Sequence, residues 1–234
     1  MSVAIIHYSS YPVIGGVETV IQAHAKLFAK HGYSVKLITG MGKQFDPKIP
    51  VIVIPEMRAL HLVDKTLHNE LQHGNVSKNF EKLTTSIYGK LKRELAHTRI
   101  CIAHNVLTMH FNLALTSALA KLIGESAGVG RIPQKQFISW AHDATFLDPH
   151  YEKESKDTYP WNFLARPLKG VRQVTISNLR KRKIACLFKI RQEPVKNPPK
   201  TYEAGLVLSP PQAGSAPFEK LNLGSYDFVL LYPT

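Results

Sequence analysis

Three short groups of residues have the types and spacing to do chemistry. His104-Asn105 and His142-Asp143 each follow an apolar run, and Gly15-Gly16-Val17-Glu18 lies shortly after another. A histidine beside a carboxylate can orient a hydroxyl or stabilise developing charge, and it titrates near neutral pH. Two glycines at a helix start leave backbone N–H groups open to an anion. The sequence therefore predicts a phosphate-binding turn beside two histidines; a bare turn and structural histidines are the alternatives.

The elements that must position these groups follow from hydrophobic periodicity. Strands are predicted at Val3–Ile6, Val35–Thr39, Val51–Pro55, Arg99–His104, Gln136–His142 and Val171–Ser177. Helices are predicted at Val17–Phe28, Lys65–Gln72, Val76–Ala96, His110–Ile123, Tyr159–Ala165 and Leu179–Phe188. Continuous apolar strands that alternate with helices indicate a doubly wound α/β fold, a parallel sheet covered on both faces. Ligands of such sheets bind beyond the carboxyl ends of the strands, where Ser9-Ser10 and both histidine pairs fall.

Composition limits the class of protein. The chain has 234 residues, of which 44% are hydrophobic and 20% charged, as in an ordinary globular domain. No run approaches the roughly 18 to 20 apolar residues of a membrane span, and the N-terminus lacks a signal-peptide pattern, so a cytoplasmic location is expected. Cys101 and Cys186 are predicted to be reduced and buried. His61, His68 and His73 fit no zinc signature, so no metal site is expected.

The charge is strongly positive. Thirty Lys and Arg against 17 Asp and Glu give a formal net charge of +13. Much of the excess lies in Lys78–Arg93 and Arg166–Lys200, which includes Arg180-Lys181-Arg182-Lys183. Such a surface attracts a negatively charged acceptor or an anionic membrane, and peripheral contact with a membrane is expected. The alternative is that the basic runs are solvated helix faces without a partner. Aromatic residues do not alternate with the basic ones, so nucleic acid is not the expected partner.

The glycine turn matches neither of two familiar phosphate motifs, because it lacks G-x-G-x-x-G and no Lys-Ser/Thr follows it. Ile14-Gly15-Gly16-Val17-Glu18 instead resembles the N-terminal glycine loop of family 4 retaining glycosyltransferases, which have the two-domain GT-B fold. Ile102-Ala103-His104-Asn105 and Ser139-Trp140-Ala141-His142-Asp143 resemble the strand-end phrases of that family. Thr175-Ile176-Ser177-Asn178 resembles its strand before the inter-domain crossing, and Leu230-Leu231-Tyr232-Pro233-Thr234 resembles the first strand of its C-terminal domain.

This resemblance implies the acceptor-side, Rossmann-like N-terminal half of a GT-B glycosyltransferase. The intact enzyme would transfer a hexose from a nucleotide sugar to a sugar, lipid or polysaccharide acceptor, with retention and without a metal ion or other cofactor. The matching residues are His142 and Asp143 at the reacting centre, and Gly15, Gly16, Glu18, His104 and Asn105 at the donor phosphate and the acceptor.

Two roles stay open from the sequence alone. Glu18 lies in a first helical turn, so its carboxylate either favours the helix dipole as a cap or contacts the ligand. Trp140 and Trp161 flank the His142 segment, and either one is a sugar-stacking platform or a core residue.

The chain is predicted to divide into a domain at 1–190, a linker at 191–217, and the start of an absent second domain at 218–234. The linker is rich in Pro, Lys, Gly and Ser, and it lacks the Pro-Asn-Gly-Val/Ile-Asp phrase of the family. The donor-binding Arg, Lys and Glu pair of the family would belong to the second domain. The chain alone is therefore expected to bind nucleotide weakly without turnover. A non-catalytic binding module for a phosphorylated ligand or a partner is the main alternative, and a basic nucleic-acid-associated domain is the third.

Overall fold

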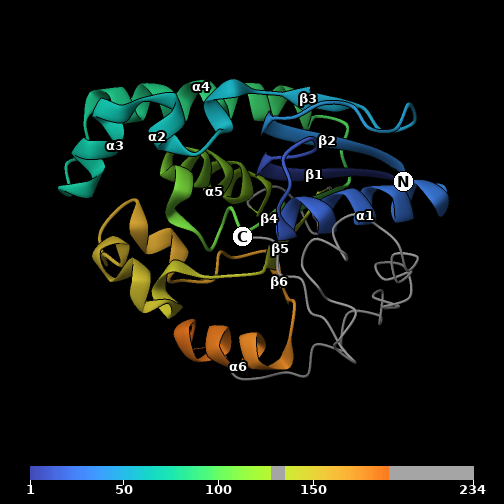
Figure 1. The fold of residues 1–234 in the computed structure, drawn as a ribbon. Helices are drawn as coiled ribbons and strands as arrows, with labels where there is room; N and C mark the ends of the chain where they lie inside the picture. Colours follow the sequence, from blue (N-terminus) through green and yellow to red (C-terminus); the bar gives the residue numbers. More distant parts are fainter. Residues whose placement is uncertain (128–134, 190–234) are drawn as a thin grey trace, which may run out of the picture. The chain divides into compact units, whose positions relative to one another are not determined.

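The computed structural model describes residues 1–127 and 135–189. Their strands form one six-stranded parallel sheet in the order β3-β2-β1-β4-β5-β6 (Figure 1). The strands are β1 (Ser2–Ser9), β2 (Ser34–Met41), β3 (Val51–Val53), β4 (Ile100–His104), β5 (Gln136–Ala141) and β6 (Val171–Thr175). The strand order reverses between β1 and β4, as in Rossmann-like folds, which place their ligands at that point.

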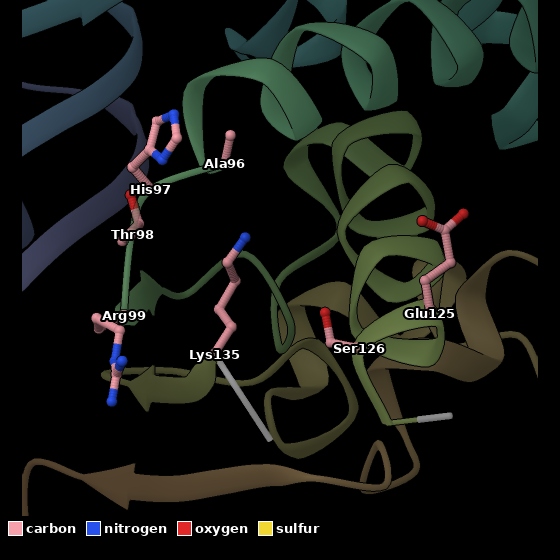
Figure 2. Close-up of a pocket in the computed structure, with 7 residues that line it drawn as sticks. All are labelled: Ala96, His97, Thr98, Arg99, Glu125, Ser126 and Lys135. Atoms are coloured by element: carbon pink, nitrogen blue, oxygen red, sulfur yellow. The ribbon is translucent and has the colours of Figure 1, made fainter. Parts of the chain in front are cut away.

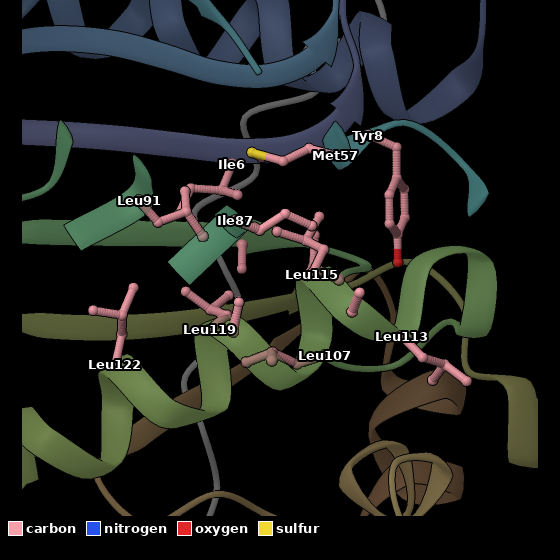
Figure 3. Close-up of a cluster of buried hydrophobic side chains, with 14 of the residues drawn as sticks. Ile6, Tyr8, Met57, Ile87, Leu91, Leu107, Leu113, Leu115, Leu119 and Leu122 are labelled. Atoms are coloured by element: carbon pink, nitrogen blue, oxygen red, sulfur yellow. The ribbon is translucent and has the colours of Figure 1, made fainter. Parts of the chain in front are cut away.

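Helices cover both faces of the sheet. On one face, α1 (Gly16–Lys30) packs Ile21 and Ala25 against Val3 and Ile5 of β1. On the other face, α4 (Lys78–Glu94) and α5 (Leu113–Ala127) lie side by side and pack against Ala4, Ile6 and Tyr8, in the cluster that Figure 3 shows. Successive side chains of a strand point to opposite faces, so β1 is apolar at consecutive positions because both of its faces are buried. The predicted doubly wound α/β fold is confirmed.

The other helices are shorter. They are α2 (Leu60–Val63), α3 (Lys65–Gln72), α6 (Asn178–Leu187) and the 3-10 turns Pro55–Met57, His110–Asn112, Thr145–Leu147, Pro149–Glu154 and Trp161–Leu164. The α6 helix follows β6 and contacts both β6 and the Thr145–Leu147 turn. Its N-terminus is capped by Ser177, whose Oγ accepts a hydrogen bond from the Arg180 N–H at 3.1 Å.

The predicted strands and long helices match the observed ones closely, but two predicted helices differ. The helix predicted at His110–Ile123 is a 3-10 turn followed by α5, because the buried Asn112 side chain accepts the Leu115 N–H at 3.0 Å and so begins a new helix. The helix predicted at Tyr159–Ala165 is a 3-10 turn, Trp161–Leu164. The linker and second-domain start predicted at 191–217 and 218–234 lie outside the described residues.

One side-chain prediction from the sequence is corrected, and one open alternative is decided. Cys101 is buried, which raises the pKa of its thiol to about 12, but Cys186 is exposed on α6 because it faces away from the packed side that holds Ile184. Trp161 is fully buried in the core against α5, so it is not a sugar-stacking platform, and only Trp140 remains for that role. In the described part of the chain, no helix is long and apolar enough to cross a membrane.

Candidate functional site

The glycine turn opens α1 without a side-chain cap. Gly15 is the N-cap residue and has an extended backbone, and its carbonyl accepts the Thr19 N–H at 3.0 Å. A Cβ on Gly15 would overlap the Glu18 carboxylate, whereas a Cβ on Gly16 would meet nothing within 4 Å. Gly15 therefore lets Glu18 fold back over the turn, and Gly16 leaves open the space beside the first N–H groups of the helix.

Glu18 links this turn to the end of β1. Its Oε1 accepts a hydrogen bond from Ser9 Oγ at 2.5 Å and lies 3.8 Å from His7 Nε2. No side chain of the described residues, Glu18 included, makes a capping hydrogen bond at the N-terminus of α1. Glu18 is thus held by β1, and the helix N-terminus keeps unsatisfied donors that suit an anion.

Four histidines from four elements pack together, and we call them the histidine cluster: His7 (β1), His24 (α1), His104 (β4) and His142 (after β5). His7 Nδ1–H donates to the His104 carbonyl at 2.8 Å. His104 Nδ1 and His142 Nε2 lie 2.9 Å apart. The His104 ring stacks on Trp140 with centroids 5.6 Å apart, and His24 meets the same indole edge-on at 4.4 Å.

The cluster is neutral at pH 7. Burial, reinforced by the proximity of His7 and His24, lowers the pKa of His142 to about 4. Burial and the neighbouring imidazoles lower the pKa of His104 far below 6.5, and burial alone lowers that of His24. For His7, burial lowers the pKa more than the His104 carbonyl and Glu18 raise it. These rings therefore act as neutral hydrogen-bonding groups rather than as cations.

Asn105 holds the His142 loop in place. It is a non-glycine residue with φ of +58°, and its N–H donates to the Trp140 carbonyl at 3.0 Å. Its Oδ1 accepts the backbone N–H groups of His142 at 2.8 Å and of Asp143 at 3.2 Å. Because both hydrogen bonds end on the side-chain oxygen, Asn105 ties the end of β4 to the loop after β5.

Asp143 points toward α6. Its Oδ1 lies 2.5 Å from Arg180 Nη2, and its carboxylate is about half exposed. Arg180 opens the basic run of α6, so a guanidinium of that run sits at the carboxyl edge of the sheet. Among the contacts of the described residues, no hydrogen bond joins the Asp143 carboxylate to the His142 ring.

The structure thus brings the predicted site residues, Gly16 excepted, into one series of contacts, and Gly16 lies beside it in the glycine turn. It also adds His7 and His24, which the sequence reasoning did not assign to the site. Their signals were present: His7 is a polar residue within the first apolar strand, and His24 lies on the inner stripe of α1 with Ile21 and Ala25. No group of three or more His, Cys, Asp or Glu in the described residues could hold a metal ion.

A hollow of about 590 Å³ lies at the opposite, amino edge of the sheet (Figure 2). It is lined by Ala96, His97, Thr98, Arg99, Glu125, Ser126 and Lys135. None of the predicted site residues lines it. It lies between the end of α5 and the starts of β4 and β5, away from the strand ends where parallel sheets place ligands.

No protein-family model and no curated protein matches this sequence. Among solved structures, the chain is similar to WaaG, a glycosyltransferase involved in lipopolysaccharide biosynthesis, with a TM-score of 0.41 and 12% identity. The match covers 81% of this chain and 42% of that one, so this chain spans less than half the length of its structural neighbour.

Proposed function

We propose that the chain is the acceptor-side half of a glycosyltransferase, with a GT-B arrangement in the intact enzyme. The observation that carries this proposal is the unbroken series of contacts from the glycine turn to His142. Glu18 meets His7, His7 meets the His104 carbonyl, and the His104 ring meets His142. These contacts run across the carboxyl ends of β1, β4 and β5, where the strand order reverses and α/β sheets bind ligands.

Each part of this edge suits one part of a nucleotide-sugar reaction. The uncapped N-terminus of α1 offers backbone donors and the positive end of a helix dipole to the diphosphate. His142 offers a neutral imidazole to a sugar hydroxyl, and Asn105 fixes its backbone. The exposed Arg182 and Lys183 of the basic run on α6 favour an anionic acceptor or membrane surface. Transfer of a hexose with retention, as in family 4, rests on the sequence resemblance.

A binding module is the second candidate. The observation that favours it is that the glycine turn and the uncapped α1 N-terminus, both within the described residues, offer backbone donors to a phosphate without any other part of an enzyme. A module of this kind would bind a phosphorylated ligand without releasing nucleoside diphosphate.

We predict that Gly16→Leu weakens nucleotide-sugar binding by this chain at least tenfold. The open space at Gly16 would receive the new side chain without a clash, so it would occupy the ligand's position and leave the fold intact. Binding of UDP-glucose, UDP-N-acetylglucosamine and GDP-mannose is measured by isothermal titration calorimetry. We expect wild-type affinity at about the millimolar level, and at least a tenfold loss in the variant.

Gly89→Leu is the matched control. Gly89 lies on α4 and also has open space around a Cβ, so this variant should bind like wild type. Equal binding by the Gly16→Leu variant would contradict the proposed site. Binding of inorganic phosphate but of none of the three sugar nucleotides would favour the binding module.

A further inference from the structure

We propose that His104 is a positioning residue that fixes His142 in the tautomer with its proton on Nδ1. His142 then serves as a neutral hydrogen-bond donor to a ligand oxygen, and not as a general base at that nitrogen. The inference about the tautomer stands on geometry, and only the identity of the ligand rests on the proposed function.

The starting observation is the pair of ring nitrogens at 2.9 Å, His104 Nδ1 and His142 Nε2. At this distance one nitrogen carries a proton and the other accepts it. Two arrangements are possible. Either His104 Nδ1–H donates to His142 Nε2, or His142 Nε2–H donates to His104 Nδ1.

The surroundings of His104 distinguish these two hydrogen-bond arrangements. Its ring is fully buried against Trp140, and its Nε2 is a buried atom without a hydrogen-bond partner. A neutral ring carries one proton. On Nε2 that proton would make a buried N–H without an acceptor, which costs about 1–3 kcal/mol, whereas on Nδ1 it has His142 as acceptor. His104 is therefore the donor.

The tautomer of His142 follows from that of His104. Its Nε2 accepts the hydrogen bond, and burial keeps the pKa of the ring at about 4, so the single proton at neutral pH lies on Nδ1. No described residue makes a hydrogen bond to this Nδ1, which leaves its N–H for a ligand. The group that it suits is an oxygen acceptor, either a sugar hydroxyl or a phosphate oxygen.

The test is two-bond ¹H–¹⁵N correlation NMR on the chain labelled with ¹⁵N-histidine, at pH 7.5 and without ligand. We expect His104 and His142 both to show a protonated Nδ1 and a bare Nε2, with signals assigned by His104→Phe and His142→Gln. His104→Phe keeps an aromatic ring on Trp140 but removes the donor. We expect His142 then to lose its fixed tautomer and to populate both neutral forms, because no donor favours one of them.

His24→Phe is the matched control, because His24 also packs on Trp140 but has no hydrogen bond to His142. This variant should keep the Nδ1–H form of His142. A wild-type His142 that is protonated on Nε2, or on both nitrogens, would overturn the proposal. Because no ligand is present, the spectrum is independent of the calorimetry: a failure to bind sugar nucleotides would count against the proposed function and leave the tautomer result intact.

Discussion

Lowering the pH from 7 toward 5 is expected to destabilise the fold steeply, with the uptake of at least two protons on unfolding. The pKa values of the histidine cluster lie below 6.5 in the folded chain because the rings are buried, and they return to about 6.5 on unfolding. Above pH 6.5 such histidines are neutral in both states, and the free energy of unfolding is at its full value. As the pH falls toward the folded pKa, only the unfolded chain takes up the protons, so the free energy of unfolding decreases. For His142 alone, the difference between 6.5 and about 4 corresponds to about 3 kcal/mol.

Urea unfolding at pH 7.5, 6.5 and 5.5 checks this prediction. An uptake of two protons corresponds to a loss of about 2.7 kcal/mol in the free energy of unfolding per pH unit. The carboxyls whose pKa values are lowered, Glu56 and Glu125, change stability only below 4.5 and so do not contribute in this range. His142→Gln should reduce the proton uptake by about one. A free energy of unfolding that stays constant from pH 7.5 to 5.5 would show that the histidines are not buried as a neutral group.

Replacing Asn105 by valine is expected to cost about 4 kcal/mol of stability. A β-branched residue at φ of +58° is strained by about 1–3 kcal/mol. The N–H groups of His142 and Asp143 would also lose their acceptor, at about 1–3 kcal/mol for each group that stays buried. The free energy of unfolding in urea measures the total, and amide hydrogen exchange at His142 and Asp143 measures the loosening of the loop.

Two further substitutions separate the effect of the backbone strain from that of the lost hydrogen-bond acceptor. Asn105→Asp keeps an oxygen acceptor and tolerates the left-handed backbone, so it should lose the least stability. Asn105→Gly relieves the backbone but removes the acceptor, and its loss should lie between those of the other two. If the glycine and aspartate variants are equally stable, the side-chain oxygen does not hold the loop.

The fold could be predicted from the sequence because its strands and long helices have clear periodicity. Continuous apolar runs such as Val3–Ile6 are typical of strands buried on both faces. The 3-10 turns between Thr145 and Glu154 were not predicted, since turns of three to six residues carry no periodic signal. The start of α5 depends on Asn112, whose amide also donates to the carbonyls of Glu56 and Arg58; sequence patterns do not reveal such distant contacts.

The site was predicted in part. His104 and His142 were expected at one edge because they follow strands of a parallel sheet, and His104 indeed pairs in register with Trp140, two residues before His142. His24 was not expected at the site, because its place beside Trp140 depends on how α1 packs on the sheet. The role of Asn105 depends on a left-handed backbone; asparagine is enriched there, but many asparagines are not in that conformation.

The wide sequence separation of the histidine contacts has a consequence for the order of folding. His7 and His104 are 97 residues apart, and His104 and His142 are a further 38 apart. Contacts of such high contact order form late, because the chain must first bear the entropy of closing long loops. During synthesis, β1 and β2 leave the ribosome before β4 and β5, so the nascent chain first carries His7 without its partner His104. We therefore expect the carboxyl edge of β1, β4 and β5 to be among the last parts of the domain to assemble.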